Sequence, residues 1–275
     1  MASTKHAHLD LLVKSDKVYK TKDGLDVEVY QLNLEGATEE VVSNWAKHFR
    51  QQYCLDEKID ELIAGTGMTR KKFLQEIVFP SGTTKLGPAV RSGDFAEILL
   101  ADVLEHVESY WTPRTRYSSK AVADESTKGS DVLGLKLVNS PEQWEPDDVL
   151  FIGESKAQMS GTKPKARLQD SVNDSSKDSL RKSQSLHAAK RKLLEEGRND
   201  DALRVQRFQD PLSRPHAEQY GAVAILSSEY LSEDVIADTT CELHANKGQL
   251  RLLVLHAKDL MAFVHSLYER AAHEA

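Results

Sequence analysis

The most constraining feature of this 275-residue sequence is an apolar run at residues 149–152 that leads into an acid and a lysine, Glu154 and Lys156. Side chains two positions apart in a strand project from the same face of the sheet. The two opposite charges would then lie together where the buried run stops. Because buried charges are costly unless they are paired or bound, the segment predicts either a functional site or a solvated ion pair at a strand end.

A second acid, Asp131, opens another strand-like run at residues 132–138. Asp131 and Glu154 are 23 residues apart, which leaves room for two adjacent strands and a turn. The connection at residues 139–147 contains two prolines and is typical of a turn region. We therefore expect Asp131, Glu154 and Lys156 to form a site of two carboxylates and one lysine.

The amino-acid composition limits the class of protein that this chain can form. The chain is 40% hydrophobic and 29% charged, with helix-like and strand-like segments interspersed, which predicts a globular α/β protein. No apolar run has the length of a membrane span and the first residues lack the apolar core of a signal peptide, so we expect a cytoplasmic location. Cys54 and Cys241 have no metal-binding spacing and are expected to be buried reduced thiols. No glycine-rich phosphate loop is present.

The N-terminal part has the pattern of a small mixed unit. Residues 26–34 alternate polar and apolar side chains with the period of a half-buried strand, and a helix should follow from residue 38. Trp45 and Phe49 fall at helical spacing and are expected to be core residues. Further helices are expected at residues 56–64 and 69–77.

Turn-forming residues at 80–88 mark a boundary between two regions. We predict that residues 1–88 form a mixed α/β region packed on the core or on a partner. Residues 89–275 would then form the main domain.

Glu97 lies in a strongly helical segment that we expect to begin at Asp94. Its neighbours three, four and seven positions along are apolar, so the acid lies beside a surface that packs inward. One interpretation places Glu97 in the functional site. In the other, Asp94 is the N-cap and Glu97 is the N3 residue, where an acid favours the helix dipole.

The remaining elements alternate between strands and helices. We expect strands at residues 110–117, 221–226 and 250–256, one helix or two over residues 165–196, and a closing helix at residues 258–272. The run at residues 221–226 is almost continuously apolar, which is typical of a strand covered on both faces.

The formal net charge of −7 counts against a protein that binds nucleic acid unaided. Residues 163–207 are an exception, with 12 Lys and Arg against 7 Asp and Glu, a net charge of +5. This basic segment could contact nucleic acid or a partner, or it could be a solvated helix face.

The predicted site suits a metal-dependent phosphodiesterase. Mg²⁺ prefers oxygen ligands and keeps several waters, so Asp131, Glu154 and the backbone carbonyl of Ser155 would suffice to hold it. Lys156 could orient or deprotonate the attacking water if the site lowers its pKa, or it could stabilise developing charge. Glu97 could reach the metal through water or align Lys156.

Three segments resemble the PD-(D/E)xK nuclease superfamily and, more closely, the HamA nucleases of the Hachiman anti-phage defence system. They are residues 93–100 (GDFAEILL), 129–134 (GSDVLG) and 151–156 (FIGESK), within a likeness that extends over residues 89–230. Ser130 stands where the superfamily often has proline. The resemblance implies Asp131 and Glu154 as metal ligands, Lys156 as the catalytic lysine and Glu97 as an acid of the core, with Mg²⁺, or Mn²⁺ in its place, as cofactor.

The same resemblance implies a fold and a function. The fold would be an α/β restriction-endonuclease-like core, a mixed central sheet flanked by helices in the order α-β-β-β-α-β, with an N-terminal α/β extension. The function would be that of a metal-dependent DNA nuclease effector, controlled by a HamB-like helicase partner. Two alternatives stay open: a non-catalytic interaction subunit with a nuclease-like fold, and a stand-alone restriction or repair nuclease.

Overall fold

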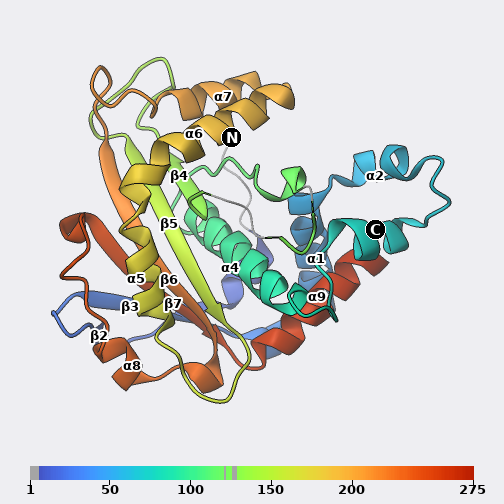
Figure 1. The fold of residues 1–275 in the computed structure, drawn as a ribbon, viewed down its shortest axis with the longest axis horizontal. Helices are drawn as coiled ribbons and strands as arrows, with labels where there is room; N and C mark the ends of the chain where they lie inside the picture. Colours follow the sequence, from blue (N-terminus) through green and yellow to red (C-terminus); the bar gives the residue numbers. More distant parts are fainter. Residues whose placement is uncertain (1–5, 121, 126–128) are drawn as a thin grey trace.

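The computed structural model describes residues 6–120, 122–125 and 129–275. Within these ranges the strands form one mixed sheet of seven strands, with helices on both of its faces (Figure 1). Three apolar clusters fill the space between the sheet and the helices. The expected α/β class is confirmed.

The sheet has the order β1-β3-β7-β6-β5-β4, and β2 pairs with β3 outside this path. β3, β7, β6 and β5 run parallel, while β4 and β1 are antiparallel to their neighbours. The strands are β1 (Leu12–Lys14), β2 (Tyr19–Lys20), β3 (Asp26–Leu32), β4 (Val132–Lys136), β5 (Val149–Gln158), β6 (Ala217–Ser227) and β7 (Leu250–Ala257).

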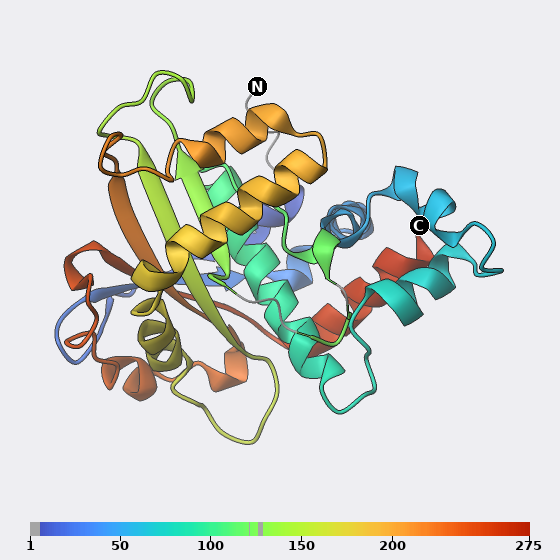
Figure 2. The ribbon, with the colours of Figure 1, turned by 45° about the horizontal axis from the view of Figure 1, so that its top comes forward.

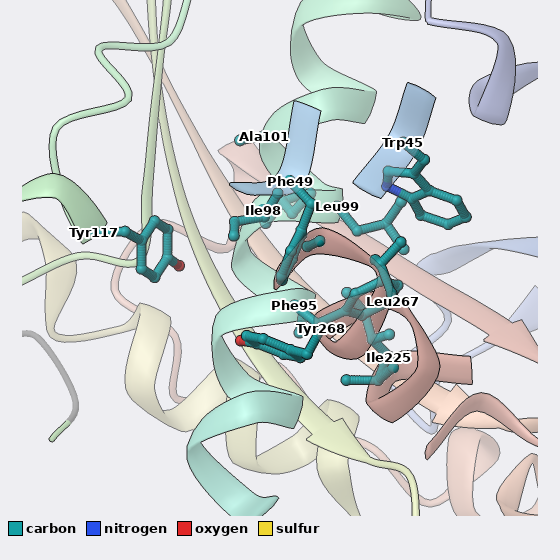
Figure 3. Packing of buried hydrophobic residues seen from close by; sticks show 14 of the residues in the cluster. Trp45, Phe49, Phe95, Ile98, Leu99, Ala101, Tyr117, Ile225, Leu267 and Tyr268 are labelled. Carbon is teal, nitrogen blue, oxygen red and sulfur yellow. The ribbon is translucent and has the colours of Figure 1, made fainter. Parts of the chain in front are cut away.

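One face of the sheet is covered by α1 (Glu39–Tyr53), α4 (Gly87–His106) and α9 (Leu260–His273). Aromatic side chains from all three helices meet here, among them Trp45, Phe49, Phe95 and Tyr268 (Figure 3). Trp45 and Phe49 are buried, as expected from their spacing. The N-terminal part of the chain therefore shares both the sheet, through β3, and this core, through α1.

The other face is covered by α5 (Arg167–Ser175), α6 (Asp178–Glu195), α7 (Asn199–Gln206) and α8 (Glu233–Ala237). α6 and α7 lie over β4 and β5, on the opposite side from α4 (Figure 2). α5 and α8 pack over the middle of the sheet. β4 and β5 are thus held between α4 and α6.

Shorter elements complete the chain. α2 (Asp56–Ile63) and α3 (Arg70–Phe73) project beside the C-terminal end of α9 (Figure 1), and a π-helical turn follows at Leu74–Val78. Single 3₁₀ turns occur at Ala7–Leu11, Leu34–Gly36, Tyr117–Ser119, Ser228–Tyr230 and Lys247–Gln249.

Three sequence expectations are corrected by the fold. Residues 110–117 are not a strand: one bridge joins Trp111 to Leu135, and the rest of the segment forms a loop over α4. The helix expected from Asp94 begins at Gly87, where Pro88 occupies its first turn. α7 was not expected as a separate element. The observed order from α4 is therefore α-β-β-α-α-α-β, with two strands before the next helix where three were predicted.

Other expectations are confirmed. The region 165–196 forms two helices, α5 and α6, and β6 is buried over most of its length. Cys54 and Cys241 are free, buried thiols. Among the described helices, none has the length and apolar content needed to cross a bilayer.

Candidate active site

The site forms where β4 begins beside β5. The two strands pair only as far as Val132 opposite Gly153, so beyond Gly153 no strand formed by the described residues lies beside the β4-facing edge of β5. Asp131 fills part of this gap, because the backbone N–H of Ser155 donates a hydrogen bond of 2.9 Å to Asp131 Oδ2. The N–H and C=O of one strand residue point to the same side, so the Ser155 carbonyl also faces this open edge.

Glu154 and Lys156 project from the same face of β5, as their spacing predicts. Lys156 Nζ lies 3.6 Å from Glu154 Oε2. Glu154 is only 3% exposed and β5 continues to Gln158, so the interpretation as a solvated pair at a strand end is wrong for Glu154.

Lys156 is held by an acid that the sequence reasoning missed. Its Nζ lies 2.7 Å from Asp174 Oδ2, near the end of α5. Burial acts to lower the pKa of Lys156, but the hydrogen bond to Asp174 and the charges of Asp131 and Glu154 outweigh it and raise the pKa. Of the two roles expected for Lys156, the one that needs a lowered pKa is therefore not favoured in the protein without a bound cation.

A second missed acid, Asp178, is the first residue of α6 and is fully buried. Ser130 Oγ donates a hydrogen bond of 2.9 Å to Asp178 Oδ1, and the Asp178 carboxyl group lies beside Glu154. Burial, followed by the charges of Asp131 and Asp178, raises the pKa of Glu154 to about 9. In the sequence, Asp178 resembles any acid that opens a helix, which gives no sign of its burial.

Arg181, one turn further along α6, also faces the site. Its Nη1 lies 3.4 Å from Glu154 Oε1. One positive charge of the basic segment is therefore part of the site rather than of a free surface. Lys182 beside it pairs with Glu218 of β6.

Glu97 approaches from the opposite face of the sheet, on α4. The Tyr117 hydroxyl donates a hydrogen bond of 2.6 Å to Glu97 Oε2. Burial, followed by the charge of Asp131, raises the pKa of Glu97 to about 8. Because α4 begins at Gly87, the capping interpretation of Glu97 is wrong. No hydrogen bond or ion pair between described residues joins Glu97 to Lys156.

Arg116 connects Glu97 to Asp131. Arg116 Nε lies 3.0 Å from Glu97 Oε2, and Arg116 Nη2 lies 3.4 Å from Asp131 Oδ1. Its Nη1 also donates to the carbonyl oxygen of Ser130. A guanidinium from the loop between α4 and β4 therefore balances the charge of both acids.

Ser171 of α5 fixes the backbone at the site. Its hydroxyl donates a hydrogen bond of 2.8 Å to the carbonyl of Glu154 and accepts one of 2.9 Å from the N–H of Val223 in β6. Ser171 is fully buried. The position of Glu154 is therefore set by α5 as well as by the sheet.

The donor chemistry at this position suits a hard divalent cation. Asp131, just before β4, and Glu154 of β5 bring two carboxyl groups together, and Asp178 adds a buried carboxyl group beside Glu154. Within the described part of the chain, no three His, Cys, Asp or Glu side chains form a ready-made metal cage. Two carboxylates with several waters are nevertheless a common set for Mg²⁺, so the residues fit the expected ion.

Comparison with known proteins identifies the family. A family model described as HamA matches residues 6–271, nearly the whole chain. Comparisons with curated proteins and with solved structures gave no match. The chain belongs to the HamA family, whose members are components of the Hachiman anti-phage defence system.

Proposed function

We propose that this protein is the nuclease effector of its defence system, a metal-dependent hydrolase of DNA phosphodiester bonds. The observation that carries this proposal is the meeting of Asp131, Glu154 and Lys156 at the open edge of β5. The family resemblance assigns its metal ligands and catalytic lysine to these same three residues. The mixed sheet held between α4 and α6 is also compatible with a restriction-endonuclease-like core.

In the proposed mechanism, Asp131 and Glu154 would hold Mg²⁺ or Mn²⁺, and the Ser155 carbonyl, which faces the same edge, would offer a third oxygen. When bound, the ion would supply charge neutralisation at the phosphate and an activated water. Lys156, on the same face of β5 as Glu154, would stabilise the negative charge that develops on the phosphate. Asp174 holds Lys156 in position for this role.

Delivery of DNA is assigned to the helicase partner of the Hachiman system. The net charge of −7 gives the chain little electrostatic attraction for DNA. In the proposed arrangement the helicase engages the DNA and presents a strand to the nuclease. This dependence would also limit cleavage in the absence of infection.

The test is a DNA cleavage assay in Mg²⁺, with and without the helicase. Glu154→Ala and Lys156→Ala should each reduce cleavage to background, and EDTA should abolish it in the unaltered protein. Glu35→Ala and Lys258→Ala are matched controls, because this acid and lysine form an exposed pair at 2.9 Å just beyond the ends of β3 and β7. The controls should cleave normally.

Each alternative function has its own outcome in this assay. Undiminished cleavage in both site variants would refute the assignment of the site. No cleavage under any condition, with a normal defence phenotype in the site variants, would indicate a non-catalytic subunit. Full activity without the helicase would indicate a stand-alone nuclease.

A further inference from the structure

Arg116 lies between two acids of the candidate site. Its Nε is 3.0 Å from Glu97 Oε2, and its Nη2 is 3.4 Å from Asp131 Oδ1. Glu97 belongs to α4, whereas Asp131 is the residue before β4. One guanidinium group therefore joins two acids that reach the site from different elements of the fold.

Three contacts fix Arg116 in this position. Besides its ion pairs with the two acids, its Nη1 donates a hydrogen bond to the carbonyl oxygen of Ser130, the residue before Asp131. The Arg116 side chain is 20% exposed, and its neighbour Tyr117 donates a hydrogen bond of 2.6 Å to Glu97 from the same loop. A guanidinium group that is mostly buried and held at three points is a constant part of the site.

The position of Arg116 is that of a cation in a two-metal site. In such sites two ions lie about 3.5–4 Å apart, and a carboxylate between them contacts both. Asp131 has the place of the shared carboxylate, because it lies next to Arg116 on one side and acts on the charge of Glu154 on the other. The place of a second ion, between Glu97 and Asp131, is the place that Arg116 occupies.

The space between Asp131 and Glu154 differs from this. Lys156 Nζ lies 3.6 Å and Arg181 Nη1 lies 3.4 Å from Glu154, and neither of them forms an ion pair with Asp131. Among the described residues, no lysine or arginine bridges these two acids. A divalent ion can therefore bind between them without displacing a bridging side chain.

We infer that Arg116 takes the place of a second cation, so that the site holds one divalent ion, between Asp131 and Glu154, and Glu97 is not one of its ligands. The inference rests on the proposed function, because that function supplies the ion. An arginine is charged at every pH at which the protein is folded, so the positive charge beside Asp131 does not depend on metal concentration. Arg116 is thus a positioning residue that holds Glu97 and Asp131 in place.

The number of bound ions can be counted without any cleavage. Equilibrium dialysis of the full chain against Mn²⁺ alone at pH 8 should give one ion per chain. Glu154→Gln should weaken Mn²⁺ binding by about tenfold or more, because it removes a ligand. Glu97→Gln should leave the affinity for Mn²⁺ unchanged.

Variants of Arg116 test whether its charge replaces that of an ion. Arg116→Met removes the guanidinium group, so a second Mn²⁺ should bind between Glu97 and Asp131. Arg116→Lys keeps a positive charge and should bind one ion. The double variant Arg116→Met, Glu97→Gln should also bind one ion, because it lacks a ligand for the second. Thermal unfolding should show Arg116→Met to be less stable than the unaltered chain in EDTA and to recover most of this loss in Mn²⁺.

Arg251 provides the matched control, because it also bridges two acids. Its Nη2 lies 2.9 Å from Glu28 Oε1, and its Nη1 pairs with Glu108. Glu28 has a further cation, Lys14, at 2.7 Å. This pair of acids therefore keeps a positive charge in Arg251→Met, which should bind one Mn²⁺ as the unaltered chain does.

The number of ions bound decides the inference. Two ions in the unaltered chain would overturn it, as would weakened Mn²⁺ binding in Glu97→Gln. A folded Arg116→Met with one ion, or a second ion in Arg251→Met as well, would also overturn it. If Arg116→Met does not fold, Glu97→Gln and Arg116→Lys still decide. One ion per chain without DNA cleavage in Mg²⁺ would refute the proposed function and leave the role of Arg116 standing, whereas two ions with cleavage would refute this inference alone.

Discussion

The backbone N–H of Ser155 donates a hydrogen bond of 2.9 Å to Asp131 Oδ2, so the acid before β4 is fixed by the backbone of β5. This bond occupies the position where β4 would otherwise have paired with β5 beyond Gly153. Asp131 therefore has two roles, one as a hydrogen-bond acceptor that closes the strand edge and one as a negative charge at the site.

Substitutions at Asp131 should separate these two roles. Asp131→Asn keeps a carbonyl oxygen for the Ser155 N–H, so stability should change little while cleavage is lost. Asp131→Ala removes the acceptor as well and should lower the free energy of unfolding by about 1–3 kcal/mol. Urea denaturation with a parallel cleavage assay would measure both. Equal stability of the two variants would contradict the structural role of this bond.

Glu154 should make stability depend on pH in metal-free buffer. Burial, with the charges of Asp131 and Asp178, raises the pKa of Glu154 from its usual 4.5 to about 9 in the folded protein. Between these pH values the folded protein keeps a proton on Glu154 that the unfolded chain releases. Stability should therefore fall as pH rises across this range. Glu154→Gln should remove the effect and be more stable at pH 8 by on the order of 2 kcal/mol. Melting temperatures at pH 5 and pH 8 would measure it.

Glu61→Gln provides the control for the pH experiment, because Glu61 is an exposed acid on α2. It should follow the unaltered protein at both pH values. If Glu154→Gln shows the same pH dependence of melting temperature as the unaltered protein, Glu154 does not have the raised pKa that this prediction requires.

Ser171 should be important for stability out of proportion to its size. Ser171→Ala leaves the Glu154 carbonyl and the Val223 N–H without their hydrogen-bond partner, so the free energy of unfolding should fall by about 1–3 kcal/mol. Cleavage should also fall, because Glu154 loses its support from α5. Ser183→Ala, at an exposed serine of α6, should change neither quantity. Equal effects of the two substitutions would contradict this role.

A buried ion pair between Arg207 and Asp148 holds the loop before β5. Arg207 Nε lies 2.7 Å from Asp148 Oδ2, and neither side chain is exposed. Arg207→Met leaves a buried carboxylate without its partner and should cost about 3–5 kcal/mol of stability. The double variant Arg207→Met, Asp148→Leu should recover part of this loss. A double variant as unstable as the sum of the two single variants would show that the pair is not coupled.

The role of the basic segment can be tested at Lys163 and Lys165, two exposed lysines in the loop after β5. Arg181 and Lys182 are less suitable because they pair with Glu154 and Glu218. Glutamate at both loop positions should weaken DNA association in a salt-dependent manner, with a smaller slope against salt concentration. Glutamate at Lys71 and Lys72 of α3 is the matched control. Unchanged DNA binding would indicate that the basic segment is a solvated helix face.

Much of the sheet could be predicted because the spacing of apolar residues along each strand reflects how many of its faces are buried. The period of two along the strand at 26–34 and the continuous apolar run at 221–226 both reflect how many faces are covered, and both strands formed as expected. The segment at 110–117 has the aromatic composition of a strand, but Tyr110 and Tyr117 are instead buried in the apolar cluster between the sheet and helices α1, α4 and α9. Composition alone does not distinguish these two kinds of burial.

Only the part of the site that is formed by residues close together in the sequence could be predicted. The spacing of two between Glu154 and Lys156 placed them together because a strand has that period. Asp174, Asp178 and Arg116 reach the site through helix packing and loop conformation, which leave no periodic signal. The hydrogen bond from Asp174 that helps to raise the pKa of Lys156 could not be expected from the sequence, whereas the charges of Asp131 and Glu154 could.

The location of β7 between β3 and β6 has a consequence for how this protein folds during synthesis. Val27 of β3 pairs with Leu252 of β7, so the two halves of the sheet remain separate until β7 has been made. Contacts between such distant residues form late and slowly. We therefore expect that a nascent chain lacking β7 does not complete the apolar core on which β5 packs. The active site should become rigid only after translation has passed residue 257.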